Sequence, residues 1–181
     1  MTVIHALEIP VAATLVIFML MIAEATLAER HDRRLLAQGG VEARGDVYPI
    51  MRVVYPACFL AMAVESAVIG PPPRGWLLAG LALFAAAKAL KYWAIATLGE
   101  RWSFRVIVLP DVPLVTKGPY RWLRHPNYVG VVGELAGAAV LLHAPVTGAA
   151  SLVVFGVLLV QRIRVEERAL HRDREGRIVG E

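Results

Sequence analysis

Five long runs of apolar residues, separated by polar connections rich in arginine, dominate this sequence. Hydrophobic residues make up 57% of the 181 residues, which is more than a typical soluble domain contains. About 20 consecutive apolar residues allow one helix to cross a bilayer. We therefore predict an all-α fold, a polytopic membrane helical bundle in a single domain over residues 1–181. Its five transmembrane segments are expected at residues 4–28, 48–69, 76–97, 128–142 and 147–161.

The last two apolar segments are short, about 22 Å each at ~1.5 Å per residue. Only residues 143–146 separate them, so we expect a helical hairpin whose outer ends emerge on the same side. The pattern is compatible with spanning helices in a locally thinned membrane and with a re-entrant hairpin. The first segment is too long for the core of a signal peptide and follows no basic residue, so we expect it to be retained.

The placement of arginine and lysine predicts the orientation of the bundle, because cytoplasmic connections carry an excess of these residues. Of the 19 basic residues, Arg74 alone falls on the opposite side. The others lie in three polar stretches, at residues 29–47, 98–127 and 162–181, with Arg52, Lys88 and Lys91 near the same ends of their segments. We expect the N-terminus outside the cell and the C-terminus in the cytoplasm.

Several common kinds of catalytic site are missing from the sequence. The single cysteine, Cys58, argues against a disulfide framework or a cysteine metal cluster. The histidines are scattered without ligand spacing, and GxSxG, HExxH, CxxC, P-loop and GxGxxG motifs do not occur. We therefore expect no metal site. The net charge of +4 is explained by membrane topology, and no nucleic-acid partner is expected.

The densest group of chemistry-bearing side chains lies at residues 118–130. Arg124 and His125 directly precede Pro126, which can open the fourth helical segment because its missing N–H costs nothing there. A helix N-terminus beside Arg and His can bind a carboxylate or a phosphate. The plainer interpretation is a basic loop that contacts lipid headgroups.

A second polar stretch, residues 162–170, continues the fifth segment out of the membrane. Arg162 and Glu166 are four residues apart and therefore share a helix face. A carboxylate here could accept hydrogen bonds from ribose hydroxyls or from an amine. Ordinary pairing of charges along a solvated helix is the alternative explanation.

The fourth segment carries Glu134 at membrane depth, where a carboxyl group is costly and usually faces the protein interior or a cavity. Bonding of a protonated Glu134 to a neighbouring helix is the alternative. Gly133 and Gly137 form a small-xxx-small pair, which permits close helix approach and would permit a homodimer. We interpret the other carboxyl groups near helix ends as packing or interface residues: Glu8, Glu24 and Glu65.

Taken together, the two polar stretches resemble a known enzyme family. The pattern RHPxYxG at residues 124–130, followed by RxxxEExxL at residues 162–170, is similar to that of the isoprenylcysteine carboxyl methyltransferase family. Residues 90–108 and 29–49 resemble a bacterial subgroup of that family. This subgroup is associated with type III polyketide synthases and methylates alkylresorcinols or alkylpyrones.

The resemblance implies an enzyme of the bacterial inner membrane that uses S-adenosylmethionine, leaving S-adenosylhomocysteine, in a cytoplasmic pocket formed by residues 98–127 and 162–181. The cofactor-binding residues that it implies are Val115, Gly118, Tyr120, Arg124, His125, Pro126, Tyr128, Glu166 and Glu167. The residues that it implies around the acceptor oxygen are Arg162 and Arg164, with His125 as a base where one is needed.

The implied acceptor is an oxygen of a lipophilic small molecule whose tail lies among the membrane lipids. A carboxylate needs no base, whereas a phenol, with an ordinary pKa of about 10, must lose a proton. Two alternatives keep the enzyme class and change the acceptor to a prenylcysteine-type carboxylate or a lipid amine. Two others change the class: a nicotinamide-dependent membrane reductase, or a lipid-binding membrane protein without catalytic activity.

Overall fold

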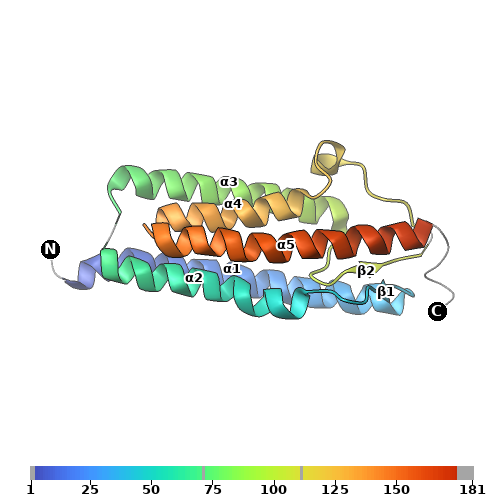
Figure 1. Ribbon diagram of the computed structural model, residues 1–181. Coiled ribbons are helices and arrows are strands. Elements are labelled where there is room, and N and C mark those ends of the chain that lie inside the picture. The colour runs from blue at the N-terminus through green and yellow to red at the C-terminus, as the bar shows by residue number, and fades with distance from the viewer. Residues whose placement is uncertain (1–2, 71, 111, 175–181) are drawn as a thin grey trace.

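The computed structural model describes residues 3–70, 72–110 and 112–174 as a bundle of helices that run along one common axis (Figure 1). The five α-helices are α1 (Val3–Ala37), α2 (Tyr48–Ile69), α3 (Arg74–Leu98), α4 (Pro126–Leu141) and α5 (Pro145–Arg174). Two 3-10 helices are η1 (Gly99–Arg101) and η2 (Gly118–Arg121). The strands β1 (Val41–Glu42) and β2 (Ile107–Val108) pair antiparallel, with Val41 opposite Val108.

Helix length and composition support a multi-pass membrane protein. In the described part of the chain, four helical stretches are long and apolar enough to cross a membrane: Pro10–Ala37, Tyr48–Ile69, Arg74–Arg101 and Pro145–His171. The fourth apolar segment forms α4, whose 16 residues give a length of about 24 Å. The predicted helical hairpin is confirmed, since α4 and α5 pack against each other after a short turn.

Two helices are longer than the apolar pattern predicts. The first segment was expected to end at residue 28, but α1 continues to Ala37 and so carries Arg30, Arg33 and Arg34 on a helix. The fifth was expected to end at residue 161, but α5 continues to Arg174. Hydropathy marks where a helix leaves apolar surroundings, whereas the backbone stays helical until a breaker such as Gly39, with φ +85°.

The polar connections gather at one end of the bundle (Figure 1). The β1–β2 pair, η2 and the C-terminal end of α5 lie at this end, and the α2–α3 and α4–α5 connections lie at the other. The basic stretches therefore share one end, which the predicted orientation requires. The side of the membrane on which this end lies remains a prediction.

The glycines of α4 pack against α3. A Cβ atom added to Gly137 would lie 2.6 Å from the backbone nitrogen of Phe84, and one added to Gly133 would lie 2.8 Å from the Cβ of Ala87. Helix α3 thus covers the small-residue face from which the sequence suggested a possible homodimer. Close backbone approach leaves no space for a side chain here.

Replacing Gly137 with alanine should therefore lower the free energy of unfolding by about 1–3 kcal/mol, because the added methyl group overpacks the α3–α4 contact. Gly156 of α5 is the matched control, since nothing lies within 4 Å of a Cβ added there. The same substitution at Gly156 should leave stability unchanged or raise it slightly through helix propensity. Chemical denaturation in detergent micelles measures both, and equal effects would contradict the packing argument.

Candidate active site

His125 occupies a fixed position at the start of α4. Pro126 opens the helix, and the carbonyl oxygen of His125 accepts hydrogen bonds from the backbone N–H groups of Tyr128 (3.1 Å) and Val129 (3.2 Å). The imidazole ring stacks on the ring of Tyr128, with 5.4 Å between centroids and 19° between planes. The backbone hydrogen bonds and the ring stacking together hold the His125 side chain where it faces α5.

The two polar stretches meet at this histidine. Its Nε2 atom lies 3.5 Å from a carboxylate oxygen of Glu167, and its Nδ1 atom lies 3.9 Å from one of Glu166. The expectation that His125 and the paired glutamates come together is therefore confirmed. Their role in binding a cofactor stays a prediction at this point.

The hydroxyl group of Tyr128 continues this polar chain toward the interior. It donates a hydrogen bond to Glu166 Oε2 (2.6 Å) and accepts one from Arg162 Nε (3.1 Å). Since Glu166 and Arg162 lie one turn apart on α5, Tyr128 links two levels of that helix. The side chains of His125, Tyr128 and Glu166 form a row that lies between two cavities.

The larger cavity, about 610 Å³, lies beside the loop between α3 and α4 at the polar end of the bundle. Its acidic and basic groups are Arg101, Arg124, His125, Glu166, Glu167 and His171. Its apolar wall comes mainly from the loop and from α5: Ile107, Val108, Leu109, Val112, Leu114, Val115 and Leu170. A cavity with apolar walls and a few convergent polar groups is typical of a small-molecule site.

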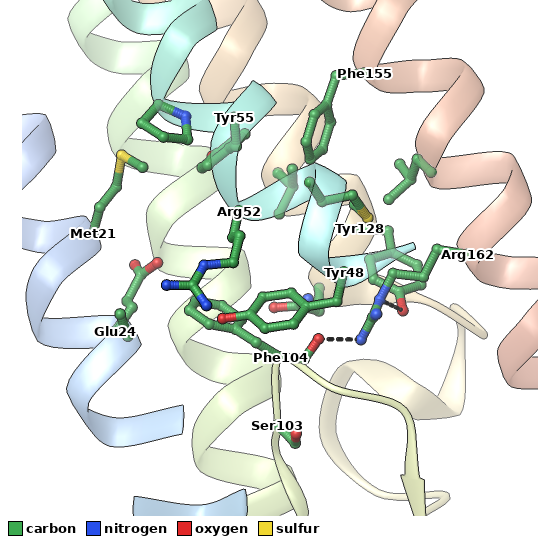
Figure 2. A pocket seen from close by; sticks show the side chains of 16 residues that line it. Met21, Glu24, Tyr48, Arg52, Tyr55, Ser103, Phe104, Tyr128, Phe155 and Arg162 are labelled. Carbon is green, nitrogen blue, oxygen red and sulfur yellow. Dashed lines mark hydrogen bonds between the residues drawn. The ribbon is translucent and has the colours of Figure 1, made fainter. Parts of the chain in front are cut away.

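The smaller cavity, about 270 Å³, lies between α1, α2, α4 and α5 on the other side of the row (Figure 2). Its lining is mostly apolar or aromatic and includes Met21, Met51, Tyr55, Phe104, Val131, Phe155 and Leu159. Its polar groups are Glu24, Tyr48, Arg52, Ser103, Asn127, Tyr128 and Arg162. None of the residues that the structure describes lines both cavities.

The residues proposed from the sequence divide between these cavities. Those that line the larger one are Val115, Tyr120, Arg124, His125, Glu166 and Glu167. Tyr128 and Arg162 line the smaller one. Pro126 is buried at the start of α4, and Gly118, with φ +56°, forms a turn against Thr97, so these two shape the backbone without lining either cavity.

The resemblance implied that Arg162 or Arg164 holds or polarises the acceptor oxygen, and the structure places these two residues differently. Arg162 is buried and already engaged, since its guanidinium donates to Asp46, to the carbonyl oxygen of Phe104 and to Tyr128. Arg164 is exposed and lines neither cavity. One step of two residues along a helix turns a side chain by about 200°, which explains why only one of the pair faces inward.

Asp46 is a residue of this region that the sequence analysis missed. Its carboxylate pairs with Arg162 and also accepts backbone hydrogen bonds from Tyr48 (3.0 Å) and Val106 (2.9 Å). It thereby ties the α1–α2 connection and the segment before β2 to α5. Its position in a polar connection, far from Arg162 in sequence, provides no signal that would have identified it.

A buried ionic cluster lies beside the smaller cavity, and its four members are Glu24, Lys88, Lys91 and Glu134. Glu24 accepts hydrogen bonds of 2.6 Å from both lysines, and Glu134 lies 3.1 and 3.3 Å from them. The interior position expected for Glu134 is confirmed. Glu24 was expected to be a packing or interface residue, and Lys88 and Lys91 to lie near the inner end of their segment; all three belong to this cluster of two acidic and two basic side chains.

Burial also affects Tyr120 in the wall of the larger cavity. Burial, reinforced by the negative charge of Glu166, raises the pKa of Tyr120 well above its ordinary value of 10. The hydroxyl group therefore stays protonated at physiological pH. It can donate a hydrogen bond to a ligand there, but it cannot serve as a base.

Comparison with known proteins agrees with this arrangement. The model of the isoprenylcysteine carboxyl methyltransferase family matches residues 79–172, which extend from within α3 to near the C-terminal end of α5. The chain belongs to this family. The resemblance seen in the two polar stretches is thereby confirmed, and the chain is placed among membrane methyltransferases.

Individual relatives cover different shares of the chain. The uncharacterized protein YpbQ of Bacillus subtilis is 34% identical over 148 residues, which cover 82% of this chain and 88% of that protein. An uncharacterized protein of Haemophilus influenzae is 25% identical over 80% of this chain and 85% of its own. Protein-S-isoprenylcysteine O-methyltransferase A of Arabidopsis thaliana is 33% identical over 95 residues, 51% of this chain and 48% of that protein.

Proposed function

We propose that the protein is an S-adenosylmethionine-dependent methyltransferase that methylates an oxygen of a lipophilic acceptor at the cytoplasmic face of the bacterial inner membrane. One observation carries this proposal. A cavity with several charged groups at the end of the bundle and a mostly apolar cavity between the helices lie on opposite faces of the same row, formed by His125, Tyr128 and Glu166. A water-soluble donor and a lipid acceptor would approach each other from these two sides.

The larger cavity has the size and chemistry to hold the cofactor. Its volume of about 610 Å³ lies within the usual range of small-molecule sites. Glu166 and Glu167 would accept hydrogen bonds from hydroxyl or ammonium groups, and Arg124 would pair with a carboxylate. The apolar loop residues, among them Val115, would contact a base ring. When bound there, S-adenosylmethionine would supply a methyl group on a positively charged sulfur.

The smaller cavity would receive the acceptor. Its apolar lining suits an alkyl or prenyl chain, and its polar groups include Tyr128 and Arg162, which are hydrogen-bonded to each other. Holding two reactants in line is a large part of the catalysis of such a transfer. A carboxylate acceptor would need no proton removal. For a phenol or enol, His125 is the candidate base that the resemblance implies, and it would take the proton at Nε2 or Nδ1 with Glu166 and Glu167 stabilising the resulting imidazolium.

Calorimetric titration of the purified protein with S-adenosylhomocysteine tests the cofactor site directly. We expect binding, and we expect replacement of Glu167 with glutamine to weaken it by roughly ten- to a hundredfold, because a hydrogen bond to a charged group contributes about 1.5–3 kcal/mol. Arg124→Gln should act in the same direction. Arg164→Gln is the matched control, since this exposed residue lines neither cavity.

Two results of this titration would overturn the proposal. Binding of a reduced nicotinamide in place of S-adenosylhomocysteine would indicate a reductase. Absence of binding by either compound would favour a lipid-binding protein without catalytic activity. With labelled cofactor, transfer of the methyl group to acids, phenols or amines that carry the same alkyl tail would then identify the acceptor.

A further inference from the structure

Arg52 lies in the first turns of α2 and lines the smaller cavity. It precedes residues 79–172, the part of the chain that the family model matches. Figure 2 shows its side chain extending from α2 toward Tyr48 and Glu24, on the side of the cavity opposite Arg162. The two arginines of this cavity thus belong to different helices.

Every other charged group that lines the smaller cavity already has a partner of opposite charge. Arg162 pairs with Asp46, and Glu24 accepts hydrogen bonds from both lysines of the neutral ionic cluster. Among the described residues, none forms a hydrogen bond or an ion pair with Arg52. The cavity therefore carries one uncompensated positive charge.

The chemistry of this group points to an anionic ligand. A guanidinium presents a planar fork of donors that matches two oxygens of a carboxylate or the oxygens of an ionised enol. Arg52 is exposed, so an entering ligand can reach it.

We propose that Arg52 binds the anionic head of the acceptor and selects acidic acceptors over neutral ones and amines. This inference rests on the proposed methyl transfer. The acceptor enters as an anion, so no base has to remove a proton from it. The new C–O bond removes its negative charge as the C–S bond breaks and the sulfonium becomes a neutral sulfide. The methylated product no longer pairs with Arg52, which favours its return to the bilayer.

A pair of fluorescent probes tests this without the cofactor: 11-(dansylamino)undecanoate and its primary amide, which differ in the charge of the head. In a fluorescence titration in maltoside micelles, the wild-type protein should bind the acid at least tenfold more tightly than the amide. Arg52→Gln should weaken acid binding by roughly ten- to a hundredfold and leave amide binding unchanged. Arg52→Lys should retain part of the preference for the acid.

Arg44→Gln is the matched control, because Arg44 is also exposed near the same end of the bundle and lines neither cavity. Equal affinity of the wild-type protein for both probes would overturn the proposal, and so would an equal loss in Arg44→Gln. Displacement of the acid by phosphatidylglycerol, but not by phosphatidylcholine, would assign Arg52 to a lipid headgroup instead. Binding of S-adenosylhomocysteine by Arg52→Gln, measured alongside, separates failure of this inference from failure of the proposed function.

Discussion

Replacing Lys91 with methionine should lower the free energy of unfolding by about 3–5 kcal/mol, since it leaves a buried carboxylate without its partner. The Lys91 ammonium lies 2.6 Å from Glu24 Oε2 and 3.3 Å from Glu134 Oε1, and all three side chains are at most 4% exposed. With Lys91 gone, two carboxylates share the single charge of Lys88.

The measurement is reversible unfolding in detergent micelles, followed by circular dichroism. Arg34→Met is the control, because Arg34 forms an ion pair with Glu100 in which both side chains are 59% exposed, and such pairs contribute only about 0–1 kcal/mol. The double variant Lys91→Met/Glu134→Gln should recover much of the stability, since it restores a neutral cluster of Glu24 and Lys88. A single variant as stable as the wild type would contradict a charge-balanced cluster.

Replacing Arg162 with methionine should cost a similar amount, about 3–5 kcal/mol, for a related reason. Arg162 and Asp46 are each 6% exposed, and the guanidinium also donates to the carbonyl oxygen of Phe104. Removing the guanidinium leaves a buried carboxylate unpaired and a buried carbonyl without its donor. The segment before β2 should therefore loosen from α5.

This substitution also separates the two roles considered for Arg162. If the residue mainly positions the segment, the double variant Asp46→Asn/Arg162→Met should recover both stability and part of the methyl transfer. Recovery of stability with no transfer at all would assign Arg162 to the reacting groups, as the resemblance implied. Arg105→Met is the control, because the Arg105–Glu42 pair at the same end is 35% and 37% exposed.

Much of the fold follows from hydropathy alone. The five helices and the hairpin of α4 and α5 were predicted, because a backbone in lipid must satisfy its own hydrogen bonds and therefore becomes helical. The helix ends were less well predicted. Polar continuations such as residues 29–37 and 162–174 stay helical in contact with other parts of the chain, and an apolar pattern cannot register them.

The candidate site was predictable where the order of residues along the chain carries the information. The patterns around His125 and Glu167 indicated two segments that meet, and their side chains are 3.5 Å apart. The residues that complete the site were not predictable in this way. Asp46, Arg52 and Glu24 lie outside both patterns. Their contacts and their places beside the smaller cavity depend on which helices pack next to them.

The sequence by itself determined which segments are helical, which end of the bundle is basic and which motifs meet. Tertiary structure alone decided which charges are paired, so that Arg162 is bound to Asp46 while Arg52 has no partner among the described residues. The physical reason is that helical periodicity fixes the direction of a side chain on its own helix. The partner at that position depends on how far neighbouring helices are rotated and shifted, and the packing of the whole bundle sets both.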